Sequence, residues 1–128
     1  MHDRRFSTRS LRALNGVDPR LIAVATRALL TGPLDFVVTQ GLRTREQQAE
    51  LVRTGASRTM NSRHITGHAI DLAPYIDGQI RWDWPPFHSL AAAMLESAQA
   101  LNVPLEWGGH WQSFPDGPHF QIPVGQEL

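Results

Sequence analysis

The sequence predicts an α+β fold in which three helices pack on a small, mainly antiparallel sheet. Three segments repeat apolar residues at helical spacing, and several shorter runs alternate in polarity or are rich in β-branched residues. The two kinds of segment do not alternate as βαβ units, which favours an antiparallel sheet. Because the chain has 128 residues and shows neither a repeat nor a linker, we expect one domain over residues 1–128.

Capping and turn residues set the expected boundaries in the first half of the chain. Asp18-Pro19 combines an N-cap with a proline at the first helical position, and Gly32-Pro33 ends that helix. Thr44 and Gln47 have the spacing of a capping box, which begins a second helix. The expected elements are a helix over residues 18–31, a β-branched strand over 35–40, a helix over 44–54 and a polar loop over 56–66.

The second half predicts more strands and the longest helix. Asp77-Gly78 is typical of a two-residue hairpin turn, and Pro85-Pro86 begins a helix that ends near Asn102. The expected elements are a strand over 68–72, a hairpin over 75–80, a helix over 85–102, strands over 105–107 and 119–122, and a Gly- and Pro-rich loop over 108–118.

Composition excludes several classes of protein. The chain has no cysteine and no lysine, which excludes disulfide scaffolds, thiol nucleophiles and covalent lysine chemistry. The formal net charge is zero, although eleven of the twelve arginines lie in residues 1–64. A nucleic-acid-binding module built on Arg4, Arg5, Arg9 and Arg12 is an alternative, but lysines and interleaved aromatic residues are lacking. We therefore expect no nucleic-acid partner.

Neither membrane insertion nor export is predicted. The longest apolar segment, Leu21 to Leu30, contains Arg27 and is far shorter than the roughly 20 residues that span a bilayer. The N-terminus is basic, but no apolar stretch follows it, so we expect no secretory signal peptide. The protein is therefore expected to stay in the cytoplasm until something else releases it.

Three residues could form a metal site. His64 ends the polar loop, Asp71 lies on the following strand, and His119 lies on a C-terminal strand. Two histidines and one carboxylate would leave a fourth tetrahedral position open, as a catalytic zinc site requires. Asp71 lies among apolar residues, where an unpaired carboxylate is costly. The alternative is that the three are unrelated, since an isolated histidine more often caps, pairs or is solvated.

Two further residues could act on a substrate. Asp116 stands three residues before His119 and could accept a proton from metal-activated water, although Asp-Gly-Pro is also a common turn. Arg43 follows a predicted strand at the edge where a cleft would open. It could bind a substrate carboxylate, stabilise an oxyanion, or simply be a solvated arginine at the start of a helix.

Residues 106–111 combine aromatic side chains with two glycines and could form the floor of a groove. Trp107 and Trp111 could contact a substrate there, although tryptophans are more often part of the core. Glu106 and His110 are weaker candidates for extra metal ligands or bases.

At these residues the chain resembles the M15 family of zinc peptidases. This family includes D-Ala-D-Ala carboxypeptidases, VanX- and VanY-like enzymes, and phage endolysins that cut the L-alanyl-D-glutamate bond of peptidoglycan. The resemblance is greatest to short phage endolysins, over residues 35–44, 64–78 and 107–111, and it extends from Phe6 to Ile122. It implies a small α+β fold that is also seen in the hedgehog signalling domain. The motif residues are Ser62, His64, Gly67, Ala69, Asp71, Asp116 and His119.

The resemblance implies a role for each residue of the site. His64, Asp71 and His119 correspond to the zinc ligands, Asp116 to the catalytic base, and Arg43 to the arginine that stabilises the reacting carbonyl. The residues expected to bind substrate are Ser62, which corresponds to a motif serine near the metal, and Trp107 and His110.

The function implied is that of a Zn2+-dependent peptidoglycan endopeptidase that cuts the L-alanyl-D-glutamate bond of the stem peptide during phage lysis. We expect a monomer without a separate cell-wall-binding domain, made in the host cytoplasm and released to the periplasm and cell wall. Two alternatives stay open. One is a D-alanyl-D-alanine or L,D-carboxypeptidase of the same family. The other is an inactive metal-binding domain, which the complete set of ligands, base and arginine disfavours.

Overall fold

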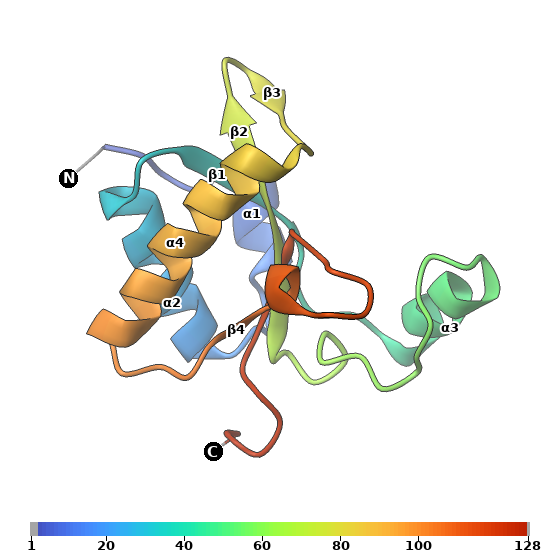
Figure 1. Ribbon diagram of the computed structural model, residues 1–128. Coiled ribbons are helices and arrows are strands. Elements are labelled where there is room, and N and C mark those ends of the chain that lie inside the picture. Colours follow the sequence, from blue (N-terminus) through green and yellow to red (C-terminus); the bar gives the residue numbers. More distant parts are fainter. Residues whose placement is uncertain (1–2, 128) are drawn as a thin grey trace.

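A computed structural model describes residues 3–127 and has an antiparallel sheet at its centre (Figure 1). The strands follow the order β1–β2–β5–β4, and β3 pairs with the end of β2. Every pairing is antiparallel, which confirms the predicted α+β class. The elements are α1 (Thr8–Ala13), α2 (Pro19–Thr31), β1 (Asp35–Gln40), α3 (Arg45–Arg53), β2 (Ala69–Ile76), β3 (Gln79–Ile80), α4 (Trp84–Ala100), β4 (Glu106–Trp107), a 3-10 turn η1 (Gly108–His110) and β5 (His119–Gln121).

The predicted caps are present. The Asp18 carboxylate accepts a hydrogen bond from the backbone of Arg20 at the start of α2. Thr44 and Gln47 form both hydrogen bonds of the capping box that begins α3. Asp77 and Gly78 both have positive φ, as a type I′ hairpin turn requires.

The prediction of three helices was wrong by one, because α1 was missed. This helix has only six residues, too few to be stable without tertiary contacts. Ser7 caps its first turn, and the Ser10 hydroxyl accepts a hydrogen bond from the backbone of Val38 in β1 at 3.0 Å. The sheet therefore holds a helix that the local sequence predicts only weakly.

The helices are arranged unequally around the sheet. Helices α2 and α4 pack against each other and cover one face, and α1 packs against β1 (Figure 1). Helix α3 extends away from the rest of the fold (Figure 1). None of the helices described between residues 3 and 127 is long and apolar enough to cross a membrane.

Strand alternation separates the core from a second, polar face of the sheet. Ile70, Leu72 and Phe120 point into the core, so the side chains between them point to the opposite face. Asp71 pairs with His119 across β2 and β5. A register shift between Val38 and Gln40 places Gln40 opposite Asp71. Strand register thus brings together polar residues of the candidate site.

Candidate active site

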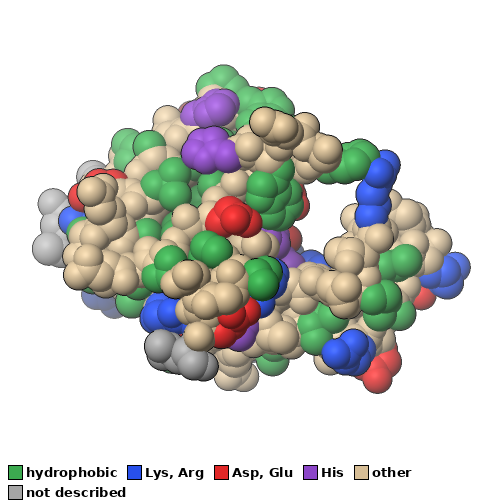
Figure 2. All heavy atoms as spheres, turned by 60° about the horizontal axis from the view of Figure 1, so that its bottom comes forward, with side chains coloured by type: hydrophobic (Ala, Val, Ile, Leu, Met, Phe, Trp, Pro, Cys, Tyr) green, Lys and Arg blue, Asp and Glu red, His purple; other side chains and the backbone are tan. Residues whose placement is uncertain are grey.

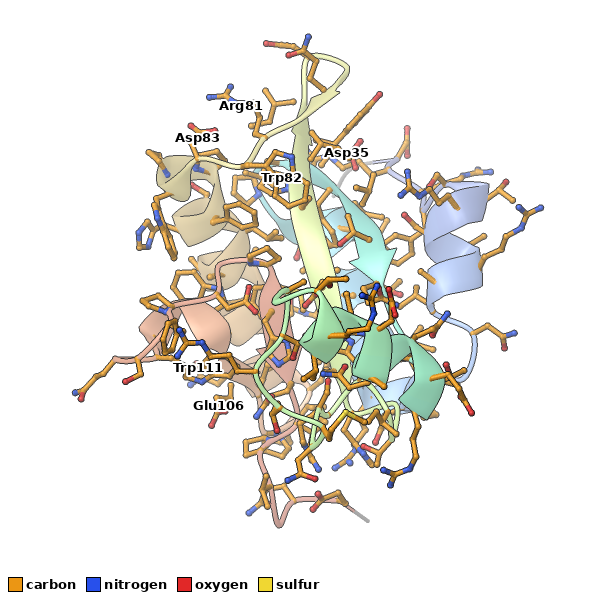
Figure 3. All side chains as sticks on the ribbon, turned by 90° about the vertical axis from the view of Figure 1, so that its right-hand side faces the viewer. Asp35, Arg81, Trp82, Asp83, Glu106 and Trp111 are labelled. Atoms are coloured by element: carbon orange, nitrogen blue, oxygen red, sulfur yellow. The ribbon has the colours of Figure 1, made fainter. Side chains whose placement is uncertain are left out.

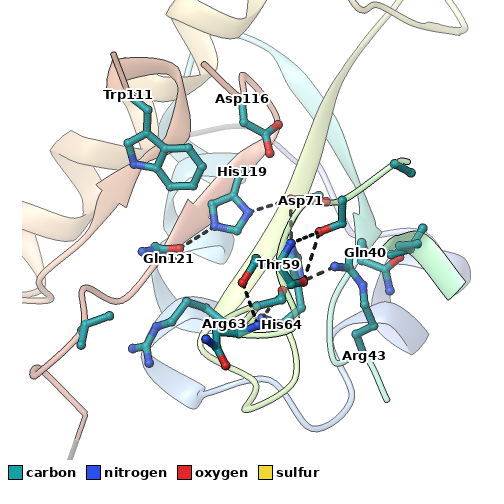
Figure 4. Close-up of a pocket in the computed structure, with 16 residues that line it drawn as sticks. Gln40, Arg43, Thr59, Arg63, His64, Asp71, Trp111, Asp116, His119 and Gln121 are labelled. Atoms are coloured by element: carbon teal, nitrogen blue, oxygen red, sulfur yellow. Dashed lines mark hydrogen bonds and ion pairs between the residues drawn. The ribbon is translucent and has the colours of Figure 1, made fainter. Parts of the chain in front are cut away.

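The structure brings His64, Asp71 and His119 together on the polar face of the sheet (Figure 4). Asp71 Oδ1 lies 3.2 Å from His64 Nε2 and 3.3 Å from His119 Nδ1. One potential ligand atom from each residue lies within 4.8 Å of the other two. Both histidines are buried, with only 2% and 7% of their surface exposed. This spacing suits one metal ion held by three side chains.

The backbone fixes the orientation of His64. Its Nδ1 donates to the carbonyl oxygen of Gly41 at 2.9 Å, because a carbonyl can only accept. In the neutral imidazole Nε2 is therefore the unprotonated nitrogen, and it faces Asp71; a hydrogen bond from His64 to Asp71 needs a second proton, on Nε2. A side chain at Gly41 would collide with the carbonyl oxygen of Ala13. Only glycine allows this close approach between α1 and the end of β1, which positions the carbonyl that holds His64.

Without a metal, the three residues form a charged hydrogen-bonded group. Burial alone would raise the pKa of Asp71, but hydrogen bonds from His119 and His64 and their positive charge hold it well below its usual range. Burial alone would lower the pKa of His119, but the hydrogen bond and negative charge of Asp71 outweigh it and raise the pKa. A divalent cation could take the place of these protons, so the donor set fits a metal.

Asp116 lies close to this group, on the loop that leads into β5 (Figure 4). Its backbone N–H donates to Gly108 at 2.9 Å, and its backbone carbonyl accepts from the His119 N–H at 3.2 Å. Burial, followed by the negative charge of Asp71, raises the pKa of the Asp116 carboxyl. A carboxylate with a raised pKa is better suited to accept and return a proton near neutral pH.

Arg43 approaches the group from the opposite side in the close-up (Figure 4). Its Nη1 donates to Gln48 Oε1 at 2.7 Å and to the Ser62 hydroxyl at 3.5 Å. Its buried Nε has no hydrogen-bond partner among residues 3–127. Burial lowers the pKa of Arg43, and the charges of Asp71 and Asp116 oppose that shift. The guanidinium stays charged and retains hydrogen-bonding capacity toward a substrate.

These residues line a groove of about 500 Å³ between the main body and the part of the chain that carries α3 (Figure 2). Ser62 lines the groove, as expected. Trp107 and His110 do not, which departs from the expectation. Trp107 is 3% exposed, and its indole donates to the Gly117 carbonyl at 2.7 Å, so it belongs to the core. The His110 ring packs edge-on against Trp107, with 4.8 Å between the ring centroids.

Two residues of the site, Gln48 and Gln121, were missed from the sequence, and Trp111 was considered there but not chosen as a substrate-binding residue. Trp111 lines the groove, and its ring lies 5.1 Å from that of His119. Gln48 is fully buried and links Arg43 to the loop through Ser57 and Thr59. Gln121 contacts His119 directly. Gln48 and Gln121 belong to no motif in the sequence, so only the folded arrangement reveals them.

A His–Asp–His group that could hold a metal, in a groove with a carboxylate on one side and an arginine on the other, is an arrangement suited to hydrolysis, and it lies in a small α+β domain. The chain belongs to the phage L-alanyl-D-glutamate peptidase family, whose model matches residues 3–121.

Similar proteins carry related names. The L-alanyl-D-glutamate peptidase of Escherichia phage T5 is 39% identical over 116 residues, which cover 88% of this chain and 85% of that protein. That of Listeria phage A118 is 33% identical over 120 residues, 91% of this chain but only 42% of that protein. The crystal structure of the Serratia marcescens L-Ala D-Glu endopeptidase ChiX matches with a TM-score of 0.88 and 40% identity, over 95% of this chain and 92% of that one.

Proposed function

We propose that this protein is a Zn2+-dependent endopeptidase that cuts the L-alanyl-D-glutamate bond of peptidoglycan stem peptides. The observation that carries the proposal is the group of His64, Asp71 and His119 beside Asp116 in a groove of a chain from this family. The phage origin of the relatives supports a role in lysis of a bacterial host, with the enzyme made in the host cytoplasm and released to the wall. We also propose that it works as a monomeric single domain.

Two imidazoles and one carboxylate favour zinc over harder cations, which prefer oxygen ligands. Zinc bound by these residues would act as a Lewis acid on the scissile carbonyl and make water more acidic. The remaining chemistry falls to the side chains of the groove.

Asp116 is assigned the proton transfers. Its carboxylate accepts a proton from the attacking water as the water oxygen bonds to the carbonyl carbon. When the carbon–nitrogen bond breaks, Asp116 returns that proton to the leaving amino group of D-glutamate. Its raised pKa supports both steps, because a general base works best when its pKa lies close to the working pH.

Arg43 is assigned to the carbonyl oxygen, which gains negative charge during the attack. A guanidinium braced by Gln48 and Ser62 is held ready for that charge instead of reorienting toward it. No arginine or lysine follows Arg81 in the sequence, and Arg63, which also lines the groove, is already bound to Glu127 and to the carbonyl of Ile122. Arg43 is therefore the one arginine lining the groove, among residues 3–127, that is not engaged by a carboxylate. This favours an endopeptidase over a carboxypeptidase.

Mass spectrometry of digested Gram-negative peptidoglycan tests the proposal. We expect released stem peptides that begin with D-glutamate, and L-alanine left on the glycan. Free D-alanine as the sole product would instead establish the carboxypeptidase. Asp116→Asn is the matched inactive control: it is expected to keep zinc and lose about 10²- to 10⁴-fold in rate.

A further inference from the structure

A row of hydrogen bonds leads from His119 to the edge of the sheet. His119 Nε2 lies 2.7 Å from Gln121 Oε1, and Gln121 Nε2 donates to Glu106 Oε1 at 2.8 Å. The indole N–H of Trp111 donates to the same Glu106 oxygen at 3.4 Å. Figure 3 shows Glu106 and Trp111 close together at this edge. The proposed reaction assigns no step to Glu106 or Gln121.

Strand geometry explains why these side chains meet. Glu106 pairs with Gln121 across β4 and β5. Gln121 lies two residues after His119, on the same face of β5. The intervening Phe120 and the neighbouring Trp107 point into the core, which fixes the strands that carry the row.

The row has one consistent order of donors and acceptors. A carboxylate only accepts hydrogen bonds, so the amide nitrogen of Gln121 faces Glu106 and the amide oxygen faces His119. Nε2 of neutral His119 must then carry the proton. Without a metal, Nδ1 also faces an acceptor, Asp71 Oδ1 at 3.3 Å, so that contact places a proton on Nδ1 as well. When a metal replaces the proton on Nδ1, the row keeps the proton on Nε2. This is the tautomer that a metal ligand at this position needs.

The two histidines need opposite tautomers, and they differ in what fixes the tautomer of each. His64 donates to a backbone carbonyl, which no side-chain substitution at that acceptor can remove. His119 faces an amide, which offers either an oxygen or a nitrogen depending on how it is turned. Asp71 favours a proton on Nδ1 of His119, and an amide alone does not favour one on Nε2. The preference for Nε2 must therefore come from the next residue along the row.

We propose that Glu106 is a positioning residue whose carboxylate, acting through Gln121, holds His119 with Nε2 protonated and Nδ1 free for the metal. The inference rests on the proposed metal site at His64, Asp71 and His119. It replaces the interpretation of Glu106 as an extra ligand or base. The Glu106 carboxylate is engaged by Gln121 and Trp111, and it is absent from the metal-binding group found among residues 3–127.

Three variants separate this role from simple packing. Glu106→Met keeps the length of the side chain and removes the acceptor, so Gln121 can turn either way. Glu106→Gln can keep an oxygen in the acceptor position. In the double variant Glu106→Met/Gln121→Glu, a carboxylate contacts His119 directly and needs no partner at position 106. Glu96→Met, at an exposed position of α4, is the matched control.

Two measurements on the full chain report the outcome. Long-range ¹H–¹⁵N spectra of the metal-free protein at alkaline pH show which nitrogen of His119 carries the proton. Competition with a chromophoric chelator gives the affinity for zinc alone. We expect Glu106→Met to shift the His119 proton from Nε2 toward Nδ1, where Asp71 accepts it, and to weaken zinc binding about 10- to 100-fold, the usual effect of losing a residue that orients a metal ligand. Glu106→Gln, the double variant and Glu96→Met should bind zinc within a few-fold of wild type.

Other results would overturn the inference. If Glu106→Met keeps a single Nε2-protonated His119 and wild-type zinc affinity, Glu106 does not orient the ligand. If the double variant binds zinc as weakly as Glu106→Met, the loss comes from packing and not from the acceptor. A wild-type protein that binds no zinc would refute the metal site itself, whereas the tautomer spectra would still test the hydrogen-bond row.

Discussion

Replacing Gln48 with methionine tests how the wall of the groove is built. Gln48 is fully buried on α3, and its amide joins Arg43 to the loop at Ser57 and Thr59. Methionine has nearly the same length and flexibility but can replace none of these hydrogen bonds. The variant therefore removes the brace of Arg43 without opening a large cavity.

The hydrogen bonds set the size of the effect. The bond from Arg43 to Gln48 Oε1, at 2.7 Å, involves a charged group, and such bonds contribute about 1.5–3 kcal/mol. The two bonds donated by the Gln48 amide are between neutral groups and contribute about 1 kcal/mol each. Thr59 is exposed, so in the variant its carbonyl oxygen can accept a hydrogen bond from water, which reduces the stability lost with this bond. We expect a loss of about 2–4 kcal/mol in the stability of α3 and the loop.

Hydrogen exchange is the appropriate assay, because α3 extends away from the main core and can open on its own. A loss of about 2–4 kcal/mol corresponds to exchange of the α3 amides that is faster by about 30- to 1,000-fold. Turnover on peptidoglycan should fall at least tenfold, mainly in kcat, because Arg43 is no longer held toward the carbonyl oxygen. Gln99→Met, exposed on α4, is the control. Unchanged α3 exchange together with unchanged kcat would refute the reasoning.

Three other variants test separate parts of the molecule. His119→Ala should abolish tight zinc binding in metal analysis; undiminished zinc would show that the ligand set is wrong. Arg43→Lys should lower kcat, because an ammonium cannot reproduce the two-donor geometry of a guanidinium; unchanged kinetics would remove Arg43 from the site. Asp18→Ala should cost about 1 kcal/mol in the free energy of unfolding at neutral pH. A hydrogen bond from Arg20 lowers the pKa of Asp18, so its stabilisation is present above about pH 4 and lost as the pH falls further. Urea titrations of both proteins should therefore converge in acid; a constant difference would contradict this.

Local chemistry made much of the fold predictable. The Asp18-Pro19 start of α2, the Thr44 capping box and the Asp77-Gly78 turn each depend on neighbours within four residues. Helix α1 was not predicted, because its contact with Val38 joins residues 28 apart. The same limit applies to sheet register, which pairs residues that lie far apart in the chain.

The site shows the same contrast between features set by neighbouring residues and features set by residues far apart in the chain. Ligand chemistry and a family motif singled out His64, Asp71 and His119, but their proximity depends on the pairing of Asp71 with His119 across two strands. Trp107 and Trp111 are four residues apart in a glycine-rich segment, and the 3-10 turn between them decides which one faces the groove. Gln48 has the sequence context of an ordinary surface residue of a helix, and only the packing of α3 against the loop shows that it is buried.

The two walls of the groove have different physical support. Two of the proposed ligands lie on β2 and β5, whose alternate residues Ile70, Leu72 and Phe120 are fully buried in the core. Arg43 and Gln48 belong to a wall that has little core beneath it and depends on side-chain hydrogen bonds. Metal affinity should therefore follow the stability of the main body, while turnover should follow the order of α3 and its loop.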